Sequence, residues 1–168
     1  MELKAQGAAV AQAASLLTTA KEEGHLDPEY GMRLLDESEE DMERALSLAD
    51  DVEIIRKDAL EAVIAAEDIA PTAKRPRKAY DMGEREVKLG SLREGEQLYR
   101  QAKKRATDII AWWSKAEATI LEATRALDGK QGAGVAHLRE MLGDAKAKLA
   151  QEQPMEAYEF ASAILPQL

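Results

Sequence analysis

Residues 92–128 read LREGEQLYRQAKKRATDIIAWWSKAEATILEATRALD, and this stretch decides the fold. The stretch contains no proline, and no residue in it breaks a helix more strongly than Gly95. It can therefore form one helix of roughly 55 Å at 1.5 Å per residue. Apolar residues recur at alternating spacings of three and four, at Tyr99, Ala102, Ala106, Ile109, Trp113, Ala116, Ile120, Ala123 and Leu127. This spacing predicts a long amphipathic helix. It averages 3.5 residues per turn, which favours left-handed packing against a partner helix.

Clear helix boundaries stand on both sides of this stretch. Gly90 is suited to end the preceding helix, and Ser91 with Glu94 three residues on is the pattern of a capping box. The glycine-rich segment 128–134 ends the long helix, and two shorter helices are expected after it, separated by a turn near 151–154.

The same apolar spacing predicts three helices in residues 1–70. Asp27 followed by Pro28 is a typical helix start, and Asp50 with Asp51 can cap a further helix. A basic, proline-containing linker is expected over 71–79, followed by a short helix to residue 89. The predicted organisation is an acidic three-helix unit over 1–70, this linker, and a second helical unit over 80–168 built on the long helix.

The composition agrees with an all-α fold. Of 168 residues, 45% are hydrophobic but only 4% are aromatic, which suits closely packed helices better than a sheet. The chain has no cysteine, which excludes disulfides and thiolate metal sites. We therefore expect a tandem antiparallel helical bundle or helical repeat with about seven helices.

The C-terminal stretch LAQEQPMEAYEFASAILP supplies a resemblance to a known family. It resembles the turn and following helix of a tetratricopeptide-like repeat, most clearly over residues 142–166. Ala145 and Ala157 fall near the small-residue positions of that family, and Pro166 falls near its terminal proline. The resemblance implies a helical repeat and no particular ligand.

Catalytic and metal chemistry find little support in the sequence. The acidic run DESEEDMER (36–44) keeps helical register, so its carboxylates spread around a helix instead of forming a calcium loop. A carboxylate-bridged metal site needs E-x-x-H pairs, and of the two histidines only His25 has a glutamate, Glu22, at that spacing. We expect no enzyme, no catalytic residue, no cofactor and no metal.

Two features could make contact with a partner. Eleven bases stand against five acids between Lys74 and Arg105, whereas the whole chain has a net charge of −9. Trp112, on the flank of the long apolar row, is either a contact residue or covered by another helix. The candidate interaction residues are Trp112, Lys74, Arg75, Arg77, Lys78, Arg100, Lys103 and Lys104.

The predicted function is that of a non-catalytic scaffold or protein–protein interaction module in the cytoplasm. The expected partner is another protein or a second copy in a homodimer, and no small-molecule substrate is inferred. An alternative is a binder of anionic surfaces, nucleic acid or membrane, through residues 74–105. A third, less favoured interpretation is a carboxylate-bridged metalloprotein. No run of about 20 apolar residues is present to span a membrane.

Overall fold

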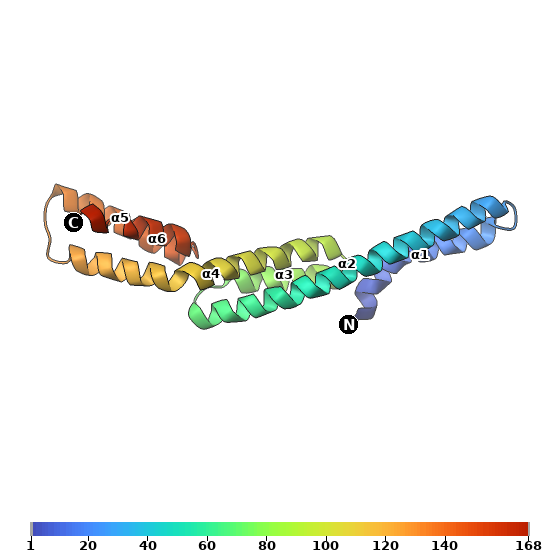
Figure 1. Ribbon diagram of the computed structural model, residues 1–168, viewed down its shortest axis with the longest axis horizontal. Coiled ribbons are helices and arrows are strands. Elements are labelled where there is room, and N and C mark those ends of the chain that lie inside the picture. The colour runs from blue at the N-terminus through green and yellow to red at the C-terminus, as the bar shows by residue number, and fades with distance from the viewer. Residues whose placement is uncertain (1, 168) are drawn as a thin grey trace. The chain divides into compact units, whose positions relative to one another are not determined.

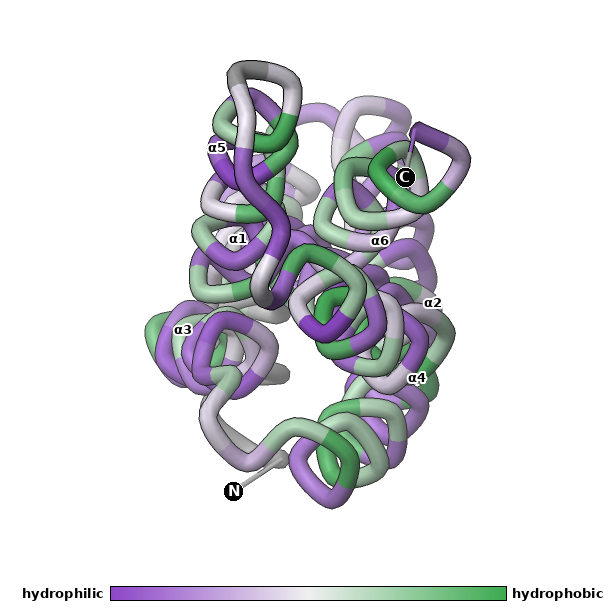
Figure 2. The backbone as a smooth tube through the Cα atoms, turned by 90° about the vertical axis from the view of Figure 1, so that its left-hand side faces the viewer, coloured by the Kyte–Doolittle hydropathy of each residue, from purple (hydrophilic) through white to green (hydrophobic). Residues whose placement is uncertain are grey.

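The computed structural model confirms the all-α fold class (Figure 1). It describes the backbone of residues 2–167 and the side chains of residues 11, 13–132 and 134–167. Six α-helices and one 3-10 helix, Leu165–Gln167, make up the described chain, and this part holds no strand. The α-helices are α1 (Glu2–Glu23), α2 (Pro28–Ile69), α3 (Arg75–Leu89), α4 (Leu92–Leu127), α5 (Ala133–Ala150) and α6 (Pro154–Ser162). Hydrophobic and hydrophilic residues alternate along them (Figure 2).

The chain forms two compact units, each assembled from two separate segments. Unit 1 contains Met1–Ala59 and Ala79–Arg100, and unit 2 contains Leu60–Lys78 and Gln101–Leu168. These units do not coincide with the sequential division at residues 71–79 that the sequence suggested. The difference arises because α2 and α4 are long, so each contributes its two ends to different units.

The long helix is confirmed as α4, Leu92–Leu127. Every member of its predicted apolar row is buried: Tyr99, Ala102, Ala106, Ile109, Trp113, Ala116, Ile120, Ala123 and Leu127. The preceding boundary is also as predicted, because Gly90 has φ 91° and ends α3. Ser91 N–H donates to Glu86 O and Gly90 N–H to Val87 O, the paired bonds of a Schellman motif.

The predicted boundary at Asp50 and Asp51 is wrong, because α2 runs through both residues without a break. For this reason residues 2–167 form six α-helices instead of about seven. The physical reason lies in the register of the inward-facing column, which has a residue every seven positions: Gly31, Ser38, Ala45, Val52, Ala59 and Ala66. Both aspartates are exposed and lie outside this column, so the helix continues past them.

The predicted basic linker is shorter than expected. Only residues 70–74 separate α2 from α3, and Arg75 to Lys78 form the first turn of α3. Pro76 is therefore in the first turn of a helix, where its missing N–H costs no helical hydrogen bond. Pro71 follows the end of α2, as expected, whereas Pro76 lies in the first turn of α3 and not in a linker.

In unit 1, α1 and the first half of α2 form an antiparallel hairpin (Figure 1). Its turn is closed by Tyr30 N–H, which donates to Asp27 Oδ1 at 3.0 Å, so Asp27 caps α2 as predicted. Ser38 Oγ donates to Ala13 O at 2.8 Å across the pair, and both side chains are buried. Small residues at the contact let the two backbones approach closely.

A polar cluster joins α2, α3 and α4 in unit 1. Arg56 Nε donates to Glu84 Oε1 at 2.5 Å, and the buried Tyr99 donates its hydroxyl to the same oxygen at 2.8 Å. Tyr80 packs its ring against that of Tyr99, with centroids 5.3 Å apart. Although burial acts to raise it, the pKa of Glu84 is held below its usual value by these hydrogen bonds. Burial, and then the bond to Glu84, raises the pKa of Tyr99.

Unit 2 has a core of small and large residues from α4, α5 and α6. Its buried members are Ala116, Ile120, Ala123, Leu127, Leu138, Leu142, Ala145, Ala157, Ala161 and Ile164. Ala145 and Ala157 are both fully buried in it. Alanines beside leucines and isoleucines let the helices interdigitate at short separation.

Two glycine substitutions test the close approach within the hairpin. A Cβ at Gly31 would lie 2.7 Å from Gly24 Cα, a backbone atom that cannot move aside, so Gly31→Ala should destabilise unit 1 by about 1–3 kcal/mol. Gly143 lies in α5 with nothing within 4 Å of such a Cβ, so Gly143→Ala should stabilise by about 0.5–1 kcal/mol. Urea unfolding followed by circular dichroism measures both, and equal effects of the two substitutions would contradict this packing.

The Arg56–Glu84–Tyr99 cluster predicts an acid-dependent contribution to stability. Because the pKa of Glu84 is lower in the folded chain, its stabilisation is complete above the unfolded pKa of about 4.3. It is lost as pH falls through the lower folded pKa. Glu84→Gln should therefore cost about 1–3 kcal/mol at pH 7, and this difference from wild type should shrink below about pH 4.

Urea unfolding of both proteins from pH 7 to pH 3 measures the difference. Glu117→Gln, an exposed glutamate in the middle of α4, is the control and should leave stability nearly unchanged at every pH. A Glu84→Gln deficit that stays constant across the range would show that ionisation of Glu84 does not contribute.

Candidate protein-interaction surface

The surface of α2 beside the hairpin contact is organised in columns with a seven-residue repeat. Next to the buried column of Gly31, Ser38 and Ala45 stands a column of Leu35, Met42 and Ala49, four residues further on in each case. The column after that holds Met32, Glu39 and Leu46. Apolar side chains therefore continue around α2 beyond the part that α1 covers.

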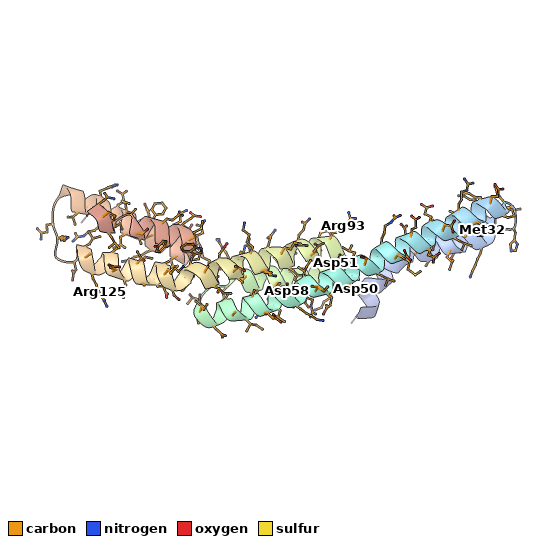
Figure 3. The ribbon with its side chains drawn as sticks, viewed as in Figure 1. Met32, Asp50, Asp51, Asp58, Arg93 and Arg125 are labelled. Carbon is orange, nitrogen blue, oxygen red and sulfur yellow. The ribbon has the colours of Figure 1, made fainter. Side chains whose placement is uncertain are left out.

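These apolar side chains are exposed. Leu35 is 38% exposed, Met42 37% and Leu46 43%. Met32, which Figure 3 places near the turn between α1 and α2, is 60% exposed. Leu17 of α1 is 40% exposed and stands four residues after the buried Ala13, the same offset that Leu35 and Met42 have from their buried column. In an antiparallel helix pair, residues with the same offset from the buried column of their own helix lie on the same side of the pair. Leu17 therefore extends this face onto α1.

Leu35 and Met42 are exposed because the apolar column to which they belong is covered only further along the chain. Further along, the same seven-residue column continues with Arg56 and Val63 of α2 and with Ala70, the residue that follows the end of α2. Arg56 there is half-buried against Glu84 of α3, and Val63 and Ala70 are 0% and 1% exposed. At Leu35 and Met42 the column is instead exposed, and Ala49 is partly buried. We name the exposed set Leu17, Met32, Leu35, Met42 and Leu46 the hairpin face.

Acidic residues border the hairpin face on its α2 side. The next column around α2 consists of Asp36, Glu43 and Asp50, all exposed, and Glu39 stands between Met32 and Leu46. Figure 3 shows Asp50 and its neighbour Asp51 on α2. An apolar row with carboxylates along one edge is the surface pattern of a site that receives another helix.

The predicted basic candidates at the start of α3 are held by a glutamate from the turn between α5 and α6. Lys74 N–H donates to Glu152 Oε1 and Arg75 N–H to Glu152 Oε2, both at 2.8 Å. Glu152 has φ 59°, unusual for a residue with a side chain, and this conformation accompanies its role as a cap. The first amides of α3 thus already bind a carboxylate of the chain itself.

Other basic candidates take part in ion pairs. Arg77 binds Glu67 through two hydrogen bonds of 2.9 and 2.6 Å, and this pairing lowers the pKa of Glu67. Arg100 donates from Nε to Glu96 at 2.9 Å. The remaining candidates, Lys78, Lys103 and Lys104, are exposed, the first on α3 and the other two on α4. Lys74 and Lys78 belong to unit 2 together with Lys103 and Lys104, whereas Arg100 belongs to unit 1.

Trp112 is half-buried because a helix covers it. Tyr158 of α6 lies against it with ring centroids 5.4 Å apart, and Lys115 Nζ lies 4.6 Å from the centre of the Trp112 ring. Of the two interpretations open from the sequence, the structure favours packing for this residue. Its ring joins α4 to α6 within unit 2.

In the described part of the chain, no three His, Asp or Glu side chains come together in a way that could hold a metal ion. None of the helices described there is both long and apolar enough to cross a bilayer.

Comparison with known proteins gives no match. No family model fits this chain, and neither a curated protein nor a solved structure is significantly similar to it.

The hairpin face could not be identified from the sequence, although a signal for it is present. The apolar spacing by itself places Leu35 and Met42 in one row with Ser38 and Ala45. Only the structure separates the covered column from the exposed one. The usable signal is the width of the stripe: apolar residues occur in three adjacent columns between 31 and 46, which is wider than one partner helix can cover.

The carboxylate of Glu152 should contribute more to the free energy of unfolding than an ordinary surface charge does. Glu152→Ala removes the acceptor of two amides and should destabilise unit 2 by about 1–2 kcal/mol. Glu152→Gly loses the same cap but suits the positive φ, so it should be less destabilising than alanine. Urea unfolding measures both variants, and Glu159→Ala, an exposed glutamate of α6, is the control. A Glu152→Ala protein as stable as this control would contradict the capping role.

Proposed function

We propose that this protein is a non-catalytic interaction module, and that the hairpin face of α1 and α2 is its docking surface. The observation that carries the proposal is the continuation of one apolar column along α2 from a covered into an uncovered region. Leu35 and Met42 occupy the same heptad position as the buried Val63 and Ala70. Covering the apolar side chains of such a row with another helix is favourable, because it removes their surface from water.

The position of the face also supports binding. It lies on two paired helices, so a partner helix laid along it would contact both, as in a three-helix bundle. The hairpin is fixed by the Ser38–Ala13 hydrogen bond and by the cap at Asp27, so little of the surface has to be ordered on binding.

The alternative proposal, an anionic-surface binder through residues 74–105, has less support. Arg77 and Arg100 are each paired with a glutamate, which reduces the charge available to a phosphate. The amides at the start of α3 are occupied by Glu152.

Site-specific photo-crosslinking in the cells that make the protein tests the docking surface. A benzophenone amino acid at position 46, on the hairpin face, should give a crosslinked adduct on irradiation. The same group at position 54 should not, because Ile54 is 62% exposed on α2 but lies outside the face. The masses of the adducts distinguish a second copy from another protein. Equal crosslinking at both positions, or none at 46, would contradict the proposal.

A double substitution provides the second arm of this test. Met42→Gln with Leu46→Gln removes the apolar character of the face where both residues are about 40% exposed. It should abolish the adduct formed from a benzophenone at position 35, and it should lower the unfolding free energy by no more than about 1 kcal/mol. Loss of the fold in this variant would instead mean that the two side chains belong to the core.

A further inference from the structure

The chemistry around the hairpin face identifies what kind of helix it receives. We infer that the helix bound at the hairpin face is a basic amphipathic α-helix of another protein, and this inference rests on the proposed function. Its apolar side chains would cover Leu35, Met42 and Leu46, and its lysine or arginine side chains would lie along the acidic column of α2.

The charge of the hairpin carries the first part of this inference. Residues 11–51 contain 12 acids and 3 bases, a balance of −9. The acids nearest the face are Asp36, Glu39, Glu43 and Asp50, which are all exposed. The three bases in this range are Lys21, Arg33 and Arg44. Arg44 pairs with Glu40 and Asp41, and the guanidinium of Arg33 lies 5.7 Å from the centre of the Tyr30 ring. A partner helix with a basic edge would be attracted, and one with an acidic edge repelled.

A second copy of the chain fits the face poorly. Two hairpin faces brought together would each carry the same negative border, and like charges at close range oppose association. The basic stretch of α4 at residues 100–105 has the right charge, but its apolar side is already used. Ala102 and Ala106 are 0% exposed and Ile109 is 1% exposed, so they cannot cover Met42 or Leu46 of another copy. An anionic membrane would be repelled by the same border.

The length of the face defines the length of the occupant. From Met32 to Leu46 the face spans 15 residues of α2, and the distance from the first to the last is roughly 21 Å along the helix. A partner helix of about four turns, about 15 residues, would cover it. Apolar residues at spacings of three and four, with bases on one edge, are the pattern expected of that helix.

Binding of three fluorescein-labelled synthetic peptides to the full chain tests the inference. The first is an 18-residue helical peptide with leucine at spacings of three and four and lysine on the flanking positions. The second replaces every lysine with glutamate, and the third keeps the lysines but replaces every leucine with glutamine. Fluorescence anisotropy at low and moderate salt should show binding of the first peptide alone.

Matched protein variants locate the binding. Met42→Gln with Leu46→Gln should weaken binding of the first peptide about tenfold. Glu39→Gln with Glu43→Gln should weaken it about fivefold at low salt, and less as salt is added. Glu37→Gln with Asp51→Asn removes two charges from other columns of α2 and is the control, with an expected effect of less than about twofold.

Each contrary outcome is distinct. Equal binding of the leucine-free peptide would mean nonspecific charge attraction and would overturn the inference. Equal binding of the acidic peptide would overturn the basic partner while leaving the hairpin face as a docking surface. Self-association that is lost in the Met42→Gln, Leu46→Gln variant, without peptide binding, would make a second copy the occupant. If no peptide binds, the chain stays monomeric and position 46 gives no crosslink, both the inference and the proposed function fail.

Discussion

A seven-residue register of small side chains along α2 is the constraint on which the rest of the fold depends. Gly31, Ser38, Ala45, Val52, Ala59 and Ala66 face inward at intervals of seven, and no larger residue than valine occurs among them. Because each position is small, a neighbouring helix can approach closely, and because the interval is constant, the contact continues over the whole helix. The glycine contact between Gly31 and Gly24, the Ser38–Ala13 bond and the burial of Ala59 and Ala66 all follow from this column.

Features encoded by neighbouring residues could be predicted from the sequence. The long helix, its buried row, the cap at Asp27 and the turn at Gly90 depend on residues within a few positions of one another. Asp50 and Asp51 were misread because a local capping preference is worth about 1 kcal/mol, less than the packing of a helix that keeps its register through them. The start of α3 could not be predicted because its cap, Glu152, stands 77 residues from Arg75.

The candidate interaction residues depended on burial, which the sequence does not determine. Trp112 was a reasonable candidate on composition, but whether it faces solvent is decided by Tyr158, 46 residues away. The bases around Arg77 formed a cluster in the sequence, yet Arg77 and Arg100 each find a glutamate in the fold. On α2 the opposite occurs: apolar residues that the spacing assigns to a core are exposed, because no other helix covers them. Which side of an amphipathic helix is covered depends on how many helices reach it.

The acidic border of the hairpin face gives the exposed row two compatible properties. An apolar row on two helices would by itself favour association between copies, since each copy presents the same row. Carboxylates at Asp36, Glu43 and Asp50 oppose that contact wherever the acidic borders of two copies come together, because like charges repel. In the proposed docking, the same carboxylates would attract a helix whose edge is basic, so one set of charges would both oppose self-association and select the partner. Selectivity on this surface would then come from the border, while the apolar row would supply the binding free energy.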